Sequence, residues 1–413
     1  MFVDDGVMYR GFGKRSYQAG FRGALLLTAA AAESQPWWID MVQRLSRQID
    51  NWETVLEQAE AHGVSALLQT VLLESGVLQE LPPHIRRRFD TWRTVRRQRH
   101  LAITLQLQAL VRVCLQEGIV PILLKGAGLA HTIYRHPEER SLADIDLLVH
   151  KRDVESVVRI LASLGYQRQP LYYSDLFNAT FGYHHLFLPS AVQGAHAVPV
   201  EVHWELASEL ERRHDLRAAI FWEDQQACGR QGDRLRCHQP SVPLQLVYSA
   251  VHLAAEGHAF NRLSGLADIA RLCDRLSVDG WQRVLQLSRL TRSKTAVWLA
   301  CTLATNLLGA SPPIDVLQEL RPSPIVMPIL DHALNAATLT SERTPLRRSA
   351  VKYFVVDGAL TAAAVLCERI FPPPAALRLL RPEWCQPSLF LAYIRHAVTV
   401  LREARRHLFL WAH

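Results

Sequence analysis

Residues 144–149 constrain the fold of this chain more than any other stretch, because they read Asp-Ile-Asp-Leu-Leu-Val. Charged and apolar residues alternate here with a period of two, which is the period of a β-strand. In such a strand the side chains of Asp144 and Asp146 point to the same side and lie close together. Two neighbouring carboxylates repel each other unless a proton or a cation lies between them. The stretch therefore predicts a strand that needs a positive partner on one face.

The residues around this strand have the pattern of strands, turns and helices that is typical of a small α/β unit. Residues 119–124 form a short apolar run that predicts a strand, and they lead into the glycine turn Lys125-Gly126-Ala127-Gly128 and a helix-like stretch at residues 129–134. The patterns that follow predict a helix at residues 153–164 and strands at residues 184–188 and 198–204.

Helical periodicity dominates on both sides of this unit. Apolar residues recur at three- and four-residue steps from residue 20 to about residue 116, and again from residue 243 to the end. A chain of 413 residues has room for two or three domains. We therefore expect an α+β fold with an N-terminal helical region (residues 1–105), a small mixed-sheet core (residues 106–240) and a C-terminal helical domain (residues 241–413).

Composition narrows the class of protein. Hydrophobic residues make up 49% of the chain and charged residues 21%, the balance of a soluble globular protein. The net charge of +7 suits an anionic partner such as nucleotide phosphates, nucleic acid or a membrane surface. The seven cysteines form no Cys-x-x-Cys pair, which favours a reducing, cytoplasmic location over a disulfide framework or a zinc site. No stretch has the ~18 apolar residues that a membrane span requires, and residues 23–32 predict a first helix rather than a signal peptide.

A third carboxylate is expected from the strand at residues 198–204. Glu201 and His203 share one face of it, and a neighbouring position in the sheet would bring Glu201 to Asp144 and Asp146. Glu205 is the competing third acid. Three carboxylates suit a pair of Mg²⁺ ions, with Mn²⁺ as a substitute, and such sites catalyse phosphoryl or nucleotidyl transfer.

Phosphate binding is expected at the glycine turn. Backbone N–H groups of Gly126, Ala127 and Gly128 at a helix N-terminus can hold phosphate oxygens. Lys125 and Arg140 are the cations nearest in sequence, and each can either bind phosphate or pair with an aspartate. His203 can bind substrate, order Glu201, or be a packed histidine. His252 and Asp268 could line the nucleotide cleft from the helical domain.

These motifs together resemble one known family. The block running from Leu123-Leu-Lys-Gly-Ala-Gly through Tyr134 to Arg140-Ser-Leu-Ala-Asp-Ile-Asp-Leu-Leu-Val is similar to the uncharacterised nucleotidyltransferase family, part of the nucleotidyltransferase superfamily with its polymerase-beta-like core. The resemblance extends to residues 201–204 and, downstream, to His252, Arg262, Asp268 and Trp281. It implies that residues 106–240 are a nucleotidyltransferase core in which Asp144 and Asp146 are the first two metal ligands.

The expected activity is metal-dependent transfer of a nucleoside monophosphate from an NTP, with ATP as the expected donor, to an unidentified hydroxyl acceptor. The glycine turn carries Ala127 where the superfamily usually has serine or glycine. A nucleotide-binding or interaction module without activity is therefore the first alternative. The second is a nucleic-acid-binding protein that uses the arginine-rich helix at residues 86–99.

Overall fold

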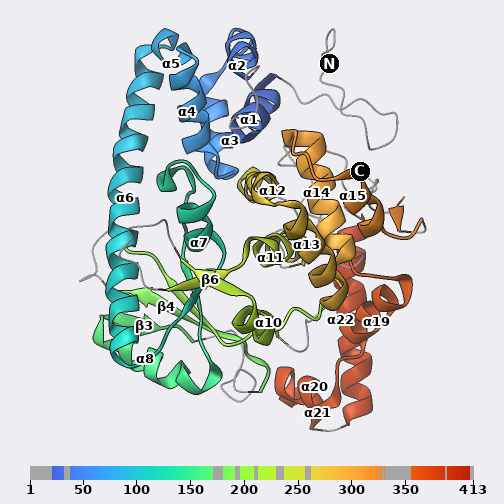
Figure 1. The fold of residues 1–413 in the computed structure, drawn as a ribbon. Coiled ribbons are helices and arrows are strands. Elements are labelled where there is room, and N and C mark those ends of the chain that lie inside the picture. Colours follow the sequence, from blue (N-terminus) through green and yellow to red (C-terminus); the bar gives the residue numbers. More distant parts are fainter. Residues whose placement is uncertain are drawn as a thin grey trace.

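The computed structural model describes residues 21–31, 38–170, 180–190, 196–208, 213–228, 237–255, 262–324, 326–327, 330, 355–386 and 388–409. Figure 1 shows a sheet in the middle of the chain, with helices from both ends of the sequence around it. Within the described residues, no helix combines the length and the apolar character that crossing a bilayer requires.

The described strands form one mixed sheet in the order β3-β4-β5-β2-β1-β7-β6. The central strand β2 is parallel to β5 and antiparallel to β1, and β1 is parallel to β7. The expected α+β class is confirmed. The strands are β1 (Ile122–Leu123), β2 (Ile145–Leu148), β3 (Tyr166–Arg168), β4 (His184–Pro189), β5 (Val200–His203), β6 (Gln225–Ala227) and β7 (His238–Pro240).

The glycine segment differs from the expected strand, turn and helix. The strand β1 covers only two residues, and helix α7 (Lys125–Thr132) begins directly at Lys125. Gly126, Ala127 and Gly128 are therefore the first turn of a helix and not a separate turn before one. The N–H group of Leu124 donates to the carbonyl of Asp146 at 3.0 Å, so the backbone leaves the sheet only at Lys125.

The N-terminal helices pack into a group that ends in one very long helix. Helix α6 has 34 residues and runs beside the sheet (Figure 1). The expected boundary at residue 105 lies inside α6, and the residue limits of the domains remain a prediction. The helices are α1 (Phe21–Ala31), α2 (Trp38–Ser46), α3 (Trp52–Ala61), α4 (Ser65–Glu74), α5 (Val77–Glu80) and α6 (Pro83–Gln116).

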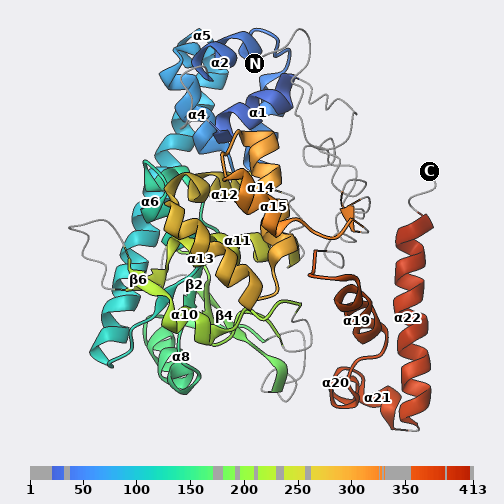
Figure 2. The same cartoon turned by 45° about the vertical axis from the view of Figure 1, so that its right-hand side comes forward.

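The remaining helices follow or interrupt the sheet. Figure 2 shows α19 to α22 as a group set to one side of the other helices. The helices are α8 (Val154–Ser163), α10 (Ala218–Glu223), α11 (Val242–Ala255), α12 (Leu263–Arg275), α13 (Val278–Leu290), α14 (Lys294–Leu308), α15 (Ile314–Leu320), α19 (Ala359–Ile370), α20 (Pro374–Leu380), α21 (Pro382–Cys385) and α22 (Leu389–Phe409).

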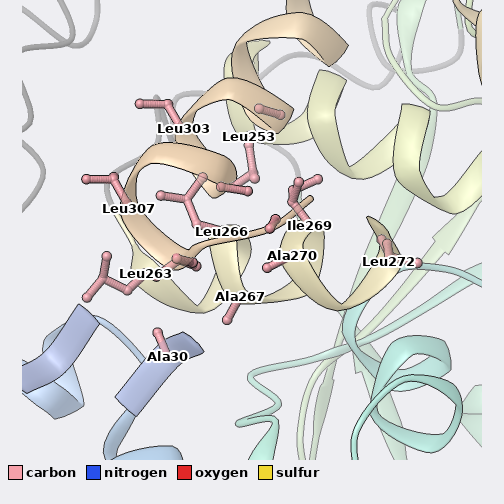
Figure 3. Close-up of a cluster of buried hydrophobic side chains, with 14 of the residues drawn as sticks. Ala30, Leu253, Leu263, Leu266, Ala267, Ile269, Ala270, Leu272, Leu303 and Leu307 are labelled. Atoms are coloured by element: carbon pink, nitrogen blue, oxygen red, sulfur yellow. The ribbon is translucent and has the colours of Figure 1, made fainter. Parts of the chain in front are cut away.

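One hydrophobic core joins helices from both ends of the chain. Figure 3 shows Ala30 of α1 beside Leu263 and Ala267 of α12, with Leu303 and Leu307 of α14 in the same cluster. All five side chains are buried. The N-terminal region and the C-terminal helices therefore pack on each other.

The two faces of strand β2 belong to different cores. Leu147 packs in a core with Leu107 of α6 and Val157 of α8, whereas Leu148 belongs to the core of the helices at both ends. Because side chains alternate along a strand, Asp146 shares the face of Leu148. The aspartate therefore points toward the C-terminal helices.

Candidate active site

Strands β2 and β5 place acidic side chains next to each other. Their parallel register pairs Asp146 with Glu201 and Leu148 with His203. Paired residues of neighbouring strands present their side chains on the same face of the sheet. Glu201 and His203 therefore lie beside Asp146, on the face that looks onto the C-terminal helices.

Asp146, Glu201 and His203 form a tight group of potential metal ligands. One ligand atom from each lies within 4.8 Å of the others. The ring Nε2 of His203 is 3.1 Å from Oδ1 of Asp146 and 3.2 Å from Oε2 of Glu201. Asp146 and His203 are buried, whereas Glu201 is partly exposed. His203 thus holds the Glu201 carboxylate in place, one of the roles that the sequence left open.

Lys125 is the second residue that contacts the Asp146 carboxylate. Its Nζ donates to Oδ1 of Asp146 at 3.1 Å. The backbone of Lys125 has a φ of 47°, in the left-handed region that side chains other than glycine rarely adopt. This conformation, at the first residue of α7, turns the chain from strand into helix and brings the ammonium group to the aspartate. The ion pair, one of the two roles open to Lys125, is present.

The two aspartates differ in charge environment. Burial would raise the pKa of Asp146, but Lys125 and His203 hold it well below its usual range. Asp144 lies just before β2 and is half-buried. Burial and the negative charges of Asp146 and Glu201 raise the pKa of Asp144 to about 6. Negative charge therefore accumulates around Asp144 without enough positive charge to balance it.

The residues of the glycine segment divide between cavity and core. Gly126 lines the cavity in front of the carboxylates, and a Cβ there would lie 3.0 Å from a methyl carbon of Leu142. Ala127 is only 2% exposed and packs in the sheet core. A Cβ on Gly128 would meet the carbonyl oxygen of Leu123 at 3.4 Å. Of these three residues, Gly126 alone lines that cavity.

Arg140 is fixed by the C-terminal helices. Its Nε lies 2.9 Å and 3.0 Å from the two carboxylate oxygens of Asp268, and its Nη2 lies 2.9 Å from Oδ2. The hydroxyl of Tyr134 also donates to Oδ1 of Asp268, at 2.6 Å. Burial would lower the pKa of Arg140, but Asp268 raises it well above the usual value. Arg140 therefore stays charged and ties the segment before Asp144 to α12.

The carboxylates face a cavity of about 410 Å³ between the sheet and helices α11 and α12, which we name the carboxylate cavity. Lys125, Gly126, Arg140, Asp144, Asp146, Glu201 and His203 line it, as do His252 and Asp268. It also includes residues that had no assigned role in the sequence: Tyr183, Ser249, Ser264 and Gly265. Tyr183 and Ser249 had no sequence signal, because their place depends on how a loop and a helix pack.

Glu205, the competing third acid, has a different task. Its Oε2 accepts a hydrogen bond from the backbone N–H of Ala218 at 3.1 Å, at the start of α10, and it does not line the carboxylate cavity. Carboxylates commonly stabilise helix N-termini in this way. Glu201 is therefore the acid that stands beside the aspartates.

The donor set fits a divalent metal ion. Asp144, Asp146 and Glu201 offer oxygen ligands and His203 a nitrogen, all lining one cavity. The raised pKa of Asp144 shows the repulsion that a bound cation would relieve. Asp144, Asp146 and Glu201 would hold the ion, with Lys125 balancing part of the acid charge.

A comparison with known protein families covers the part of the chain that carries this site. The model of a family described as uncharacterised nucleotidyltransferase matches residues 49–309, which includes the sheet, the carboxylates and helices α11 to α14. No curated protein matches the chain significantly.

Proposed function

Because the chain belongs to the uncharacterised nucleotidyltransferase family, we propose that it transfers a nucleoside monophosphate from an NTP to a hydroxyl group. In this reaction the acceptor oxygen forms a bond to the α-phosphorus, and the bond from that phosphorus to the pyrophosphate oxygen breaks. The hydroxyl proton passes to a base, and pyrophosphate leaves. The observation that carries the proposal is the convergence of Asp144, Asp146 and Glu201 on one cavity of about 410 Å³.

The expected cofactor is Mg²⁺, as a pair of ions, and Mn²⁺ can replace it. Hard cations of this kind prefer carboxylate oxygens and substrate phosphates. When bound, the metal supplies charge neutralisation for the phosphates and lowers the pKa of the attacking hydroxyl. Asp144, Asp146 and Glu201 would hold it.

The protein side chains have distinct proposed roles. Glu201 is partly exposed in the cavity and accepts the proton of the acceptor hydroxyl. His203, buried and hydrogen-bonded to Glu201, keeps that carboxylate in position. Lys125 and Gly126 line the cavity, where the Lys125 ammonium group and the backbone N–H groups at the start of α7 bind phosphate oxygens. Ala127 and Gly128 complete this first helical turn and do not line the cavity.

Arg140 and the nucleotide donor also have proposed roles. Arg140 has N–H groups besides those that bind Asp268, and it contributes positive charge to the phosphates while it fixes the segment before Asp144. ATP is the proposed donor.

The direct test is the variant Asp144→Asn. It keeps the size of the side chain and removes a negative charge, so we expect Mg²⁺-dependent release of pyrophosphate to fall by at least ~100-fold, equivalent to about 2.7 kcal/mol. Each labelled NTP is incubated with the protein in cell extract, and the label is followed. Asp153→Asn, beside α8 and outside the cavity, is the matched control. Unchanged turnover and Mg²⁺ binding in Asp144→Asn would falsify the mechanism.

A second candidate is nucleotide binding without transfer. It is favoured by one observation: Lys125 and His203 already bind the Asp146 carboxylate, so a metal ion competes with two resident side chains. Calorimetry with ATP and Mg²⁺, followed by a turnover assay, separates the candidates. A nucleotide sensor binds ATP and releases no pyrophosphate.

A further inference from the structure

A second cavity adjoins the carboxylate cavity. Its volume is about 580 Å³, and we name it the arginine chamber. It lies between helix α6, the turn from α3 to α4, and the start of α12. The side chains that matter here are Trp92, Arg96, Arg99 and His100 from α6, together with Arg262 and the segment of residues 140–143.

The two cavities share a wall. Residues 140–143, Arg262 and Ser264 line both of them. Asp144 follows this wall directly in the sequence and lines the carboxylate cavity. A molecule in the arginine chamber is therefore next to the carboxylates without occupying their cavity.

The arginine chamber carries excess positive charge. Four arginines line it, of which Arg140 is bound to Asp268, and the only lining acids among the described residues are Glu60 and Glu138. Glu138 lies 4.0 Å from Arg97. In the described part of the chain, the other three lining arginines, Arg96, Arg99 and Arg262, have no carboxylate within ion-pair distance.

Arg96 and Arg99 are held in place by neutral partners. Arg96 donates to the side-chain oxygen of Gln69, and Arg99 donates to the carbonyl of Leu142 at 3.2 Å. Burial lowers the pKa of Arg96 to about 10, so it remains a cation at neutral pH. Glu60 and Glu138 stabilise this charge only partly, since neither forms a direct ion pair with Arg96. A partly buried cation without a direct ion pair is costly, and an anionic ligand would offset that cost.

Part of the chamber lining is apolar and aromatic. Trp92 is half-buried, and its ring is held edge-on by Phe89 with a centroid distance of 5.7 Å. Val95 is 44% exposed and lines the same space. Ligand sites of small molecules combine such an apolar wall with a few charged groups that fix orientation.

We propose that the arginine chamber is the acceptor site, and that the acceptor is a small molecule in which a phosphate monoester is attached to a ring. Arg96, Arg99 and Arg262 bind the phosphate, and the ring packs against Trp92. The acceptor hydroxyl then reaches Asp144 and Glu201 past the shared wall. The assignment of the bound molecule as the acceptor rests on the proposed function, whereas phosphate binding in the chamber does not.

A small molecule fits better than a polynucleotide. Arg96, Arg99 and Arg262 line one cavity, and its volume lies in the usual range for small-molecule sites. The other arginines of the same helix that point outward, such as Arg87 and Arg93, line neither cavity. A polynucleotide would need an unbalanced basic strip along the outside of α6, but there Arg93 pairs with Asp90 and Arg97 lies 4.0 Å from Glu138.

Calorimetry with phenyl phosphate, on the full chain without NTP, tests the proposal. We expect Arg99→Gln and Arg262→Gln each to weaken binding about tenfold, because each removes a charged hydrogen bond. Arg96→Gln should weaken binding by a similar factor. If this half-buried variant does not fold, the variants of the exposed Arg99 and Arg262 still test the proposal. The control Arg87→Gln, on the outside of the same helix, should bind like the wild type. Phenol and benzoate should bind at least tenfold more weakly than phenyl phosphate.

Several results would overturn the proposal. Wild-type affinity in Arg99→Gln and Arg262→Gln would show that the chamber does not bind the phosphate. Equal affinity for benzoate would remove the phosphate assignment. Competition between phenyl phosphate and ATP, with ATP affinity also reduced in these variants, would make the chamber part of the nucleotide site. Tighter binding of a single-stranded oligonucleotide that is weakened in Arg87→Gln would indicate a nucleic-acid surface.

Different experimental results would contradict the proposed transfer reaction and the proposed acceptor site. Glu201→Gln should lose turnover and keep wild-type affinity for phenyl phosphate, because Glu201 does not line the arginine chamber. Phenyl phosphate binding with no turnover for any NTP supports the phosphate site and overturns the transfer reaction. Turnover in a protein that does not bind phenyl phosphate overturns the acceptor site alone.

Discussion

Asp146 and Asp144 show how neighbouring carboxylates acquire different charge states. Lys125 and His203 both contact Asp146, and they hold its pKa well below the usual range, whereas the pKa of Asp144 rises to about 6. Environments that separate the pKa values of paired acids are typical of active sites. At the residue scale, Asp144 is therefore the acid with most to gain from a bound cation.

We expect the free energy of unfolding to depend on pH through a histidine on the opposite face of the sheet. His185 is buried, and its ring lies 4.7 Å from that of Trp204. Burial and, less strongly, Arg168 lower the pKa of His185 to about 4. The folded protein therefore keeps this ring neutral, while the unfolded chain protonates it near the ordinary value of 6.5. Its contribution to stability is constant above that value and is lost as the pH falls from 6.5 toward 4.

We predict that His185→Phe removes this acid sensitivity. At pH 5 the wild type should have lost about 2 kcal/mol of unfolding free energy through His185, since each pH unit below the ordinary pKa adds about 1.4 kcal/mol. Urea unfolding at pH 7.5 and at pH 5 gives the free energy of unfolding of both proteins. The decrease between the two pH values should be about 2 kcal/mol smaller in His185→Phe than in the wild type. The exposed His84→Gln is the control. The same loss in His185→Phe and in the wild type would contradict the assignment.

Contacts between elements place the wall that the two cavities share. The turn between α3 and α4 packs against the start of α12, where the N–H of Ser264 donates to the carbonyl of His62 at 3.1 Å. Gly63 has a φ of +67°, and a Cβ there would lie 3.0 Å from the Ser264 hydroxyl oxygen. At the scale of elements, this close approach fixes Arg262 and Ser264 beside both cavities.

We predict that Gly63→Ala costs more stability than Gly76→Ala. Both glycines have positive φ, but a Cβ on Gly76 would meet nothing within 4 Å. Each variant should lose about 1 kcal/mol for the left-handed backbone, and Gly63→Ala should lose roughly a further 1 kcal/mol for the crowded contact. Urea unfolding gives both free energies. If the two losses were equal, the contact with Ser264 would have no energetic role.

The whole molecule depends on packing between its two ends. Helix α1 contacts α12 and α14, and their side chains share one hydrophobic core (Figure 3). The carboxylate cavity lies between the sheet and α11 and α12, and the arginine chamber lies between α6 and α12. At this scale the helices on both sides of the sheet complete the site.

We predict that Leu25→Ala in α1 destabilises distant helices as well as its own. Leu25 is fully buried in the shared core, so the cavity should cost about 2–5 kcal/mol. Hydrogen exchange should become faster in α12 and α14 as well as in α2 to α4. The control Leu73→Ala in α4 removes a half-exposed side chain and should change stability by no more than ~0.5 kcal/mol. Faster exchange confined to the N-terminal helices would show that the two ends unfold independently.

The sequence determined the parts of this protein that depend on local patterns. Period-two alternation is a property of single strands, so it was enough to predict the strands around Asp146, His184 and Glu201 and the shared orientation of Glu201 and His203. Helical periodicity predicted helices on both sides of the sheet, and helix α14 is one of them. The class of the fold followed from the order of these patterns along the chain.

Only the tertiary structure decided which partners meet over long sequence distances. Arg140 finds Asp268, 128 residues away, and His203 is shared between two carboxylates on neighbouring strands. Strands β3, β6 and β7 are too short for alternation to predict, because their neighbours in the sheet define them. The arginine chamber likewise exists only where α6 and α12 meet. Such contacts depend on register and packing, which no local stretch of sequence encodes.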